Sequence, residues 1–475
     1  MRTKNIFKKI LTLTSASFLI INLYSQIQQA EGRIAGGNMH SLVLCGDGSV
    51  WGVGRNNSGQ VGKGDFTQTI TSPSQASATG FQKIKFIDAG WVFSLALDSL
   101  GNAWTWGDNS FGQLGIGTNT GQSSPVKITA FSNNTKALAA GWMHALIIKN
   151  DGTVWASGRN NYGQLGDATI LDKKSPVQVT GLTNVEGVAG GQYHSLAVKS
   201  DGTVWAWGRC GSGLGDATIT ESHTPIQISG LTNIIKIVSL RNHTLALKND
   251  GTVWAWGSGT SGQLGNGSSI DSKVPVQVNI SGVKDIGMGQ DHSIAIKNDG
   301  TVWGWGSNLR GQLGGGATTQ LVPVQLPLSK TAVAIGAGYM HTLVVLNDGT
   351  FWGCGANDEG QLGGGITSDI ATPTQIIFPC SGISATGVEE QQNDAGKILV
   401  YPNPSYDGRF NIQLPTQKNQ VQFLEIYDSF GRMLMMEYFN NEFMKNIDLS
   451  TYAKGFYFYR VISGNESIHG KLLTE

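Results

Sequence analysis

Six histidines recur at nearly constant spacing, a pattern that could hold a metal ion or transfer protons. They are His40, His144, His194, His243, His292 and His341, and Phe93 takes the same place in one further copy. Successive copies lie about fifty residues apart, so each belongs to its own structural unit and the copies should be spread around a ring. We therefore expect a structural role, in which each imidazole bonds nearby backbone at the start of its strand.

A second repeated group that could act in acid or base chemistry is the Asp of an Asp-Gly pair. The pairs are Asp47-Gly48, Asp151-Gly152, Asp201-Gly202, Asp250-Gly251, Asp299-Gly300 and Asp348-Gly349, with Leu100-Gly101 in the remaining copy. Asp and Gly both tolerate positive φ, so each pair predicts a tight hairpin turn between two strands. The carboxylates are thus explained as turn residues.

Motifs of catalysis and cofactor binding are missing from the sequence. There is no Gly-x-Ser-x-Gly, no His-Glu-x-x-His and no phosphate-binding loop, because Gly-rich segments such as Gly311–Gly316 lack the required Lys and Ser or Thr. We expect no enzyme activity, no cofactor and no metal. A catalytic site assembled from loops of several units is the alternative that stays open.

The elements that position these residues are short strands. In Ser195–Lys199 the alternating side chains are apolar or small on both faces, which predicts a strand buried on both sides. The return strand after the turn carries a Trp in every unit, at 51, 104, 155, 205, 254, 303 and 352. A Pro-led strand and one further strand complete the period, as in 176–179 and 185–189. Four strands per period and seven periods predict seven blades of a propeller.

These residues resemble a known family. The pattern Ala-Gly-x-x-His-Ser/Thr-Leu-Ala, Asp-Gly-x-Val-Trp-x-Trp-Gly, Gly-Gln-Leu-Gly is similar to the regulator of chromosome condensation repeat, whose seven copies form a seven-bladed β-propeller. Departures are Phe93 for His, Val61 for Leu, and Gly213-Leu214-Gly215, which lacks the Gln. The resemblance implies the fold. Eukaryotic members act on a small GTPase or chromatin, a role that the neutral charge of this chain argues against.

Function is expected in the loops that vary between units. We call the loops that lead into the His strand inner loops, and those that follow the Trp strand outer loops. Both kinds lie at the same end of each blade. Arg55 and Arg209 also belong to the outer loops. We expect Trp91, Trp142 and Tyr339 to replace the small Gly that other units carry as Gly37 and Gly191, aside from Arg241 and Gln290. The predicted partner-binding residues are Trp91, Trp142, Tyr193, Arg241, Tyr339, Phe111, Arg159, Tyr162 and Arg310. Aromatic and Arg side chains favour an extracellular protein partner, and a surface glycan is the alternative.

The two ends of the chain predict export. Residues 1–25 combine early Lys and Arg with about 15 apolar residues, too few to span a bilayer, which indicates a cleavable signal peptide ending at Ser25 or Ala30. Residues 397–475 resemble the C-terminal sorting domain of the type IX secretion system. The positions that match its motifs are Pro402, Asn403, Pro404, Gly408, Gly431, Gly455, Tyr457, Gly470 and Lys471. The resemblance implies the type IX machinery as a partner and a place outside the outer membrane of a Gram-negative bacterium.

The sequence as a whole predicts an all-β protein. We expect a signal peptide (1–25), a seven-bladed propeller (32–378), a polar linker (379–396) and a small C-terminal β-sandwich (397–475), with no transmembrane segment in the mature chain. Lys plus Arg and Asp plus Glu number 33 each, so we expect no nucleic acid partner. Of the four cysteines, Cys45 and Cys380 should approach each other if the ring closes there, although three pairings are open.

Overall fold

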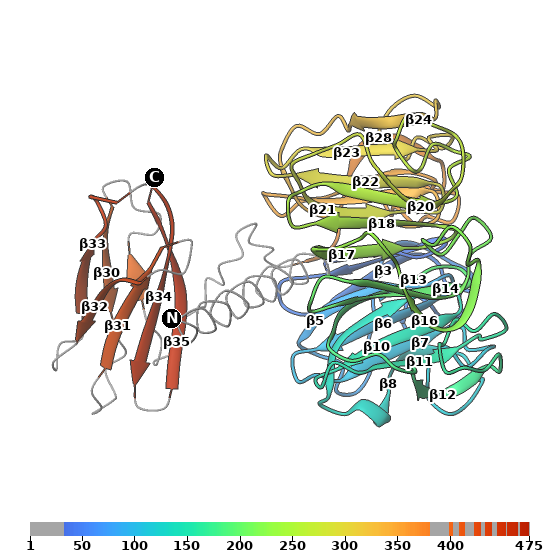
Figure 1. The fold of residues 1–475 in the computed structure, drawn as a ribbon, viewed down its shortest axis with the longest axis horizontal. Coiled ribbons are helices and arrows are strands. Elements are labelled where there is room, and N and C mark those ends of the chain that lie inside the picture. The colour runs from blue at the N-terminus through green and yellow to red at the C-terminus, as the bar shows by residue number, and fades with distance from the viewer. Residues whose placement is uncertain are drawn as a thin grey trace, which may run out of the picture. The chain divides into compact units, whose positions relative to one another are not determined.

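The structure is a computed structural model that describes residues 33–380, 399–401, 408–413, 422–428, 433–438, 444–452, 454–463 and 466–474. The predicted signal peptide and nearly all of the predicted linker lie outside the described residues. The chain divides into two compact units, residues 1–387 and 388–475. Each unit is described separately below (Figure 1).

The first unit contains seven four-stranded antiparallel sheets, and each is made of four consecutive strands in chain order. This confirms the predicted seven-bladed propeller. The first three blades contain β1 (Ile34–Gly36), β2 (His40–Leu44), β3 (Val50–Arg55), β4 (Thr69–Gln75); β5 (Ile84–Ala89), β6 (Phe93–Asp98), β7 (Ala103–Gly107), β8 (Gln122–Lys127); β9 (Thr135–Ala140), β10 (His144–Lys149), β11 (Val154–Gly158), β12 (Lys173–Gln178). A short 3₁₀-helix, η1 (Thr129–Phe131), follows β8.

The other four blades contain β13 (Val185–Gly190), β14 (His194–Lys199), β15 (Val204–Arg209), β16 (Glu221–Gln227); β17 (Ile234–Ser239), β18 (His243–Lys248), β19 (Val253–Gly257), β20 (Ser272–Gln277); β21 (Val283–Met288), β22 (His292–Lys297), β23 (Val302–Gly306), β24 (Gln320–Gln325); β25 (Ala332–Ala337), β26 (His341–Leu346), β27 (Phe351–Gly355), β28 (Ile370–Ile376). The second strand of each blade is buried along nearly its whole length, as the alternation predicted.

The Asp-Gly turns differ in detail from the expected turn. In blade 4, Gly202 N donates to Lys199 O (2.8 Å) and Lys199 N donates to Thr203 O (3.0 Å), so the loop has three residues. Gly202 has φ +75°, whereas Asp201 is not among the positive-φ residues. The two-residue turn was therefore the wrong prediction, and the observed loop is a turn followed by a left-handed Gly. Asp201 Oδ1 accepts from Thr203 N (3.0 Å) and Oγ1 (2.6 Å), which confirms the carboxylate as a turn residue.

The repeated His residues join neighbouring blades. His144 Nε2 lies 2.9 Å from Ser195 Oγ of the next blade, and Ser195 Oγ donates to Gln164 O (2.7 Å). Trp207 Nε1 donates to the same carbonyl at 2.9 Å. We call these contacts the interblade belt: a His and a Gln carbonyl of one blade, and a hydroxyl and a Trp of the next. The hydroxyls that face the other His residues are those of Ser94, Ser239, Ser293, Thr342 and Ser41.

The belt corrects the expected role of the imidazoles. They are structural, but their partner is a hydroxyl from the next blade and not nearby backbone. Ser195 has one hydroxyl hydrogen, which it gives to the Gln164 carbonyl, so the hydrogen between Ser195 and His144 belongs to His144 Nε2. His144 Nδ1 is buried without a hydrogen-bond partner among the described residues. Burial accordingly lowers the pKa of His144 to about 3.

Blade 2 departs from the belt at two positions together. Phe93 is fully buried in the place of the His, and the residue of blade 3 that would offer the hydroxyl is Ala145, also fully buried. A Cβ on Gly90 would meet the Phe93 ring at 2.2 Å, just as a Cβ on Gly141 would meet the His144 ring at 2.2 Å. The phenyl ring thus fills the same space as the imidazole, and the polar pair has become an apolar pair.

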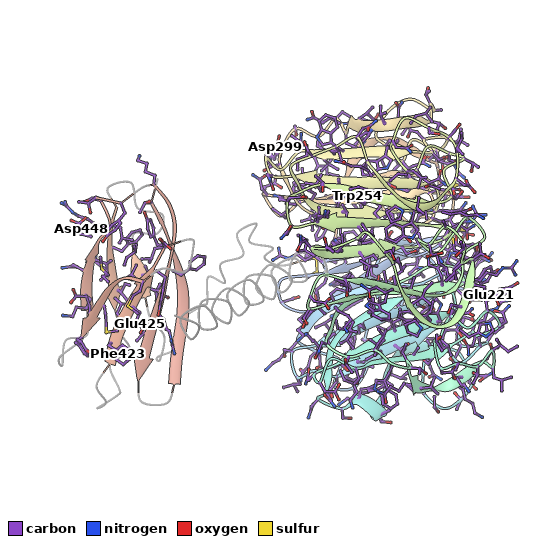
Figure 2. All side chains as sticks on the ribbon, in the orientation of Figure 1. Glu221, Trp254, Asp299, Phe423, Glu425 and Asp448 are labelled. Atoms are coloured by element: carbon purple, nitrogen blue, oxygen red, sulfur yellow. A yellow bond between two sulfur atoms is a disulfide. The ribbon has the colours of Figure 1, made fainter. Side chains whose placement is uncertain are left out.

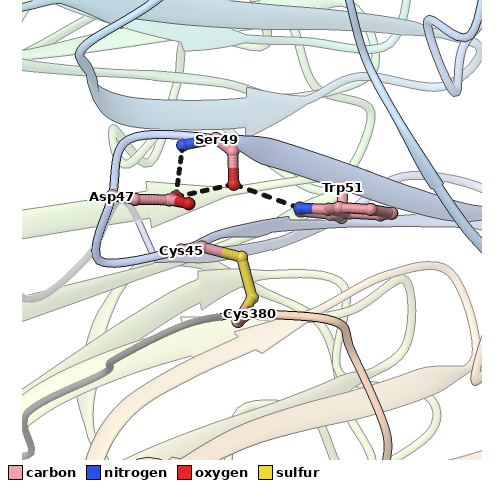
Figure 3. The surroundings of a disulfide bond; sticks show 5 residues. All are labelled: Cys45, Asp47, Ser49, Trp51 and Cys380. Atoms are coloured by element: carbon pink, nitrogen blue, oxygen red, sulfur yellow. Dashed lines mark hydrogen bonds between the residues drawn. A yellow bond between two sulfur atoms is a disulfide. The ribbon is translucent and has the colours of Figure 1, made fainter.

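The ring closes between blades 7 and 1 without a shared sheet. Strand β1 lies against β25 and β26, and Ile34, Val43, Leu343 and Phe378 belong to one buried core cluster. Cys45 and Cys380 form a disulfide, which confirms the expected pairing (Figure 3). Figure 3 also shows the Asp47, Ser49 and Trp51 chain of hydrogen bonds beside it. Cys210 and Cys354 are free, buried thiols.

The second unit contains two antiparallel sheets, in the orders β29-β30-β33 and β32-β31-β34-β35. The strands are β29 (Leu399–Tyr401), β30 (Arg409–Gln413), β31 (Gln422–Tyr427), β32 (Met433–Tyr438), β33 (Met444–Asp448), β34 (Gly455–Ser463) and β35 (Glu466–Thr474). Phe410, Ile426, Ile447 and Tyr459 share one core, which confirms the β-sandwich. Figure 2 labels Phe423 and Glu425 on β31 and Asp448 at the end of β33.

Candidate functional site

Backbone hydrogen bonds join the inner loops of neighbouring blades of the propeller. Asn38 N donates to Trp91 O (3.2 Å), Trp91 N to Trp142 O (3.2 Å), and Trp142 N to Gly191 O (3.1 Å). Gln290 N donates to Tyr339 O (3.0 Å), and Tyr339 N donates across the closure to Gly37 O (3.1 Å). These bonds hold the inner loops together at one end of the ring, which we call the loop face.

The positions of the residues in the inner loops correct one expectation about the loop face. The residues two before each repeated His, or before Phe93 in blade 2, are Asn38, Trp91, Trp142, Gln192, Arg241, Gln290 and Tyr339. Gly37 and Gly191 stand one position earlier, where a Cβ would meet the following His ring at 2.1 and 2.2 Å. Trp91, Trp142 and Tyr339 therefore vary against polar residues and not against Gly. The glycines make room for the belt, and the residue after each Gly is free to vary.

Six of the predicted residues form one continuous group, the aromatic cluster of Tyr339, Trp91, Trp142, Tyr193, Tyr162 and Phe111. The Trp91 and Trp142 ring centroids are 3.9 Å apart. The ring centroids of Trp91 in blade 2 and Tyr339 in blade 7 are 5.3 Å apart, although blade 1 lies between these two blades. Tyr193 links Trp142 (6.4 Å) to Tyr162 (4.9 Å). All six side chains are half-buried, so each keeps an accessible edge.

Arginines cover the outer part of the aromatic cluster. The Arg159 guanidinium lies 4.9 Å from the Phe111 ring centroid and 5.3 Å from that of Tyr193. This pair of contacts is what attaches Phe111 to the cluster. Arg209 lies 4.7 Å from the Tyr162 centroid. Contacts of this kind contribute about 0.5–1 kcal/mol each at exposed sites and hold the side chains in place.

The other two predicted residues lie apart from the aromatic cluster. Arg241 Nη1 bonds Asp291 Oδ2 at 3.2 Å, and Gln290 Nε2 donates to the same oxygen at 2.6 Å. Arg310 pairs with Asp369, and also with Asp358 at 3.4 Å. The Arg310 guanidinium holds the pKa of the Asp369 carboxyl below its usual value. We call this half of the loop face, from blades 5 to 7, the polar sector.

Exposed apolar residues in the outer loops were missed from the sequence. They are Phe66, Ile170, Leu171, Ile270, Leu309 and Ile366, and Ile270 reaches 73% exposure. A signal was present, because each is an apolar residue, or in 170–171 a pair of them, within a polar loop. Arg55 was also passed over, although it follows the last Gly of its strand just as Arg159 and Arg209 do. Alignment of the units would have placed these three arginines together.

The loop face has an open hollow and no recognisable metal site. A hollow of about 510 Å³ is lined by Phe111, Thr118, Asn119 and Asp172 among others. The described residues contain no group of three or more His, Cys, Asp or Glu that could hold a metal ion. Within the same residues there is no helix with the length and hydropathy to cross a membrane.

Comparison with known protein families identifies the family of the propeller. The RCC1-like domain family matches residues 135–396, and the regulator of chromosome condensation (RCC1) repeat matches residues 47–97 and 101–148. The chain belongs to the RCC1-like domain family. The resemblance inferred from the repeated motifs is thereby confirmed.

The chain is also similar to individual curated proteins over part of its length. The chain is 33% identical over 159 residues to the ultraviolet-B receptor UVR8 of Arabidopsis thaliana, covering 32% of this chain and 36% of that protein. It is 33% identical over 128 residues to protein RCC2 of Mus musculus, covering 27% and 24%. The match thus spans about a third or less of these curated relatives.

Solved structures show the same fold at lower identity. Prp20p of Saccharomyces cerevisiae superposes with a TM-score of 0.64 and 22% identity, over 74% of this chain and 89% of that one. Human WBSCR16 superposes with a TM-score of 0.62 and 23% identity, over 70% and 94%. Identities in this range support the fold alone.

The second unit matches the secretion system C-terminal sorting domain over residues 399–475. This match assigns the protein to those that are secreted or held at the outer-membrane surface of a Gram-negative bacterium. Gly408 has φ +74°, Gly455 begins β34, and Tyr457 is buried in the core. Gly470 and Lys471 pair in register with Tyr459 and Phe458. Pro402, Asn403, Pro404 and Gly431 lie outside the described residues.

Proposed function

We propose that this exported RCC1-like propeller is a binding module that captures an extracellular protein on its loop face. The observation that carries the proposal is the set of exposed apolar residues in the outer loops of the loop face: those of blades 1 and 3 accompany the aromatic cluster, and those of blades 5, 6 and 7 extend into the polar sector. Exposed apolar groups gathered on one face are typical of interaction surfaces. Aromatic and Arg side chains are the residues that contribute most at such interfaces.

A glycan ligand is the second candidate, because the rings of Trp91, Trp142 and Tyr193 could also stack on sugars. The aliphatic side chains favour a protein. Ile170, Leu171, Ile270, Leu309 and Ile366 offer no hydrogen bonds to hydroxyl groups, whereas they pack readily on apolar protein surface. Among related propellers, Prp20p has been described for its binding to Gsp1p and histones, which supports the use of this fold in protein recognition.

Export through the type IX machinery is the other part of the proposal, with residues 397–475 as the recognised domain. The sorting-domain match supports it. The proposed boundaries remain a signal peptide at 1–25, a propeller at 32–378, a linker at 379–396 and the sorting domain at 397–475. Deletion of residues 397–475 should keep the protein inside the outer membrane, and fractionation of cells that produce each form would measure this.

Site-specific photo-crosslinking of the full chain tests the binding face. A photoreactive phenylalanine replaces Ile170 on the loop face or, as a matched control, Leu100, which is 69% exposed at the opposite end of blade 2. We expect one protein to be captured at position 170 and not at 100. The variant Trp142→Ala with Tyr193→Ala should weaken that capture by about 10-fold or more. Equal capture at both positions, or retention only on a glycan array, would contradict the proposal.

A further inference from the structure

The arginines of the loop face differ in how their charge is balanced. Arg241 and Arg310, in the polar sector, each pair with an Asp. Arg55 and Arg159, in blades 1 and 3, have no Asp or Glu partner in the part of the chain that the structure describes. Arg209 is intermediate, with Glu221 Oε2 at 3.7 Å. The guanidinium charges of Arg55 and Arg159, beside the aromatic cluster, are therefore not neutralised by a contacting carboxylate among the described residues.

The two unpaired guanidinium groups are held in the same way. Arg55 Nη1 lies 3.9 Å from Met39 Sδ, and Arg159 Nη1 lies 3.9 Å from Met143 Sδ. Met39 and Met143 belong to the inner loops, so both guanidinium groups reach from the outer loops toward the inner ring. Each is half-buried. Arg55 Nε also donates to Asn57 Oδ1 (3.1 Å). A thioether is a weak acceptor, so the other N–H groups of each guanidinium stay available to a ligand.

The carboxylate at the equivalent position of blade 2 does not pair with Arg55 or Arg159. Asp108 takes the place in blade 2 that Arg55 and Arg159 take in blades 1 and 3. Its oxygens accept from Ser110 Oγ (2.7 Å) and Gln113 Nε2 (2.6 Å), so it is engaged within its own loop.

We infer that the aromatic half of the loop face binds an acidic, extended segment of a partner protein, with carboxylates on Arg55 and Arg159 and apolar side chains on the rings between them. The inference rests on the proposed protein-binding function and specifies its ligand. Guanidinium groups bind carboxylates through paired, charge-assisted hydrogen bonds. Trp91 belongs to blade 2, between the two arginines, so a segment that reaches both crosses the aromatic cluster. The exposed aliphatic residues favour an acidic protein over an acidic glycan.

Fluorescence anisotropy with the full-length protein tests the inference. The probe is a labelled peptide in which Glu alternates with Trp and Leu, compared with the same peptide carrying Gln for Glu. We expect the Glu peptide to bind at least about 10-fold more tightly, and its affinity to fall between about 50 and 500 mM salt. Arg55→Gln with Arg159→Gln should remove most of that preference. Lys330→Gln is the matched control, since Lys330 pairs with Asp348 at the end of the blades opposite the loop face, and should change the affinity by less than about 3-fold.

The outcomes separate this inference from the proposed function. Equal binding of the Glu and Gln peptides, or an unchanged affinity in the Arg55 and Arg159 variant, would overturn the inference. So would tight binding of polygalacturonate without binding of the Glu peptide, which would point to an acidic glycan. A partner crosslinked at position 170 whose capture ignores both arginines would leave the protein-binding function standing and refute the acidic segment. Circular dichroism of each variant checks that the propeller is folded.

Discussion

The interblade belt repeats one set of contacts around the ring, whereas the loop face uses equivalent positions of the same repeat for different residues. In the belt, His144, Ser195 and Gln164 are fixed by partners in two blades at once. On the loop face, Trp91 and Arg241 hold equivalent positions and have opposite chemistry. Residues that bond to two blades at once are constrained by the fold. Residues two positions before the repeated His are free to vary and can serve recognition.

A fall in pH should have the largest effect, because it should weaken the interblade belt and not the loop face. Burial lowers the pKa from 6.5 to about 3 in His40, His144, His243 and His292, and to about 4 in His194 and His341. The unfolded chain binds protons below pH 6.5 that the folded belt does not. The free energy of unfolding should therefore fall, by up to about 1.4 kcal/mol per pH unit for each His, as the pH drops toward 4. The aromatic cluster of the loop face contains no His.

Urea unfolding followed by circular dichroism between pH 7.5 and 4.5 would measure this loss. Asp88 works in the opposite direction, because burial raises its pKa to about 6, but it is one group against six. The variant His292→Phe, which copies the Phe93 solution, should be less stable at pH 7.5 and lose less stability per pH unit. A free energy of unfolding that stays constant down to pH 4.5 would show that the belt does not depend on neutral imidazoles.

Loss of the disulfide should have the next largest effect. The sheets of blades 1 and 7 share no strand, so Cys45–Cys380 is the covalent link across the closure. Cys45→Ser with Cys380→Ser should lower the free energy of unfolding by about 2–5 kcal/mol. Hydrogen exchange should rise first in β1 and β28. Wild-type protein treated with a reductant should match the variant, and unchanged exchange in both would mean that packing alone closes the ring.

The belt could be predicted from the sequence to a larger extent than the loop face. The blade motif repeats seven times, so the spacing of His, Asp-Gly and Trp was enough for the blades and the ring, whereas it left three cysteine pairings open. The partner of His144 was not predictable locally, since the Ser195 hydroxyl arrives from the next unit. The aromatic cluster was only partly predicted. Whether an Arg is paired, as Arg310 is, or unpaired, as Arg159 is, depends on loops whose shapes carry no repeat.

The smallest expected effect is the most direct test of the belt. Phe93 and Ala145 form the apolar version of the pair made elsewhere by His and a hydroxyl. Phe93→His alone should cost about 1–3 kcal/mol of unfolding free energy, because the buried imidazole would face Ala145. Adding Ala145→Ser should recover most of that loss, since the new hydroxyl can bridge the imidazole to the Gln113 carbonyl, as Ser195 does with His144 and Gln164. If the double variant is no more stable than Phe93→His, the two positions are not coupled through the belt, and the contrast with the loop face loses its physical basis.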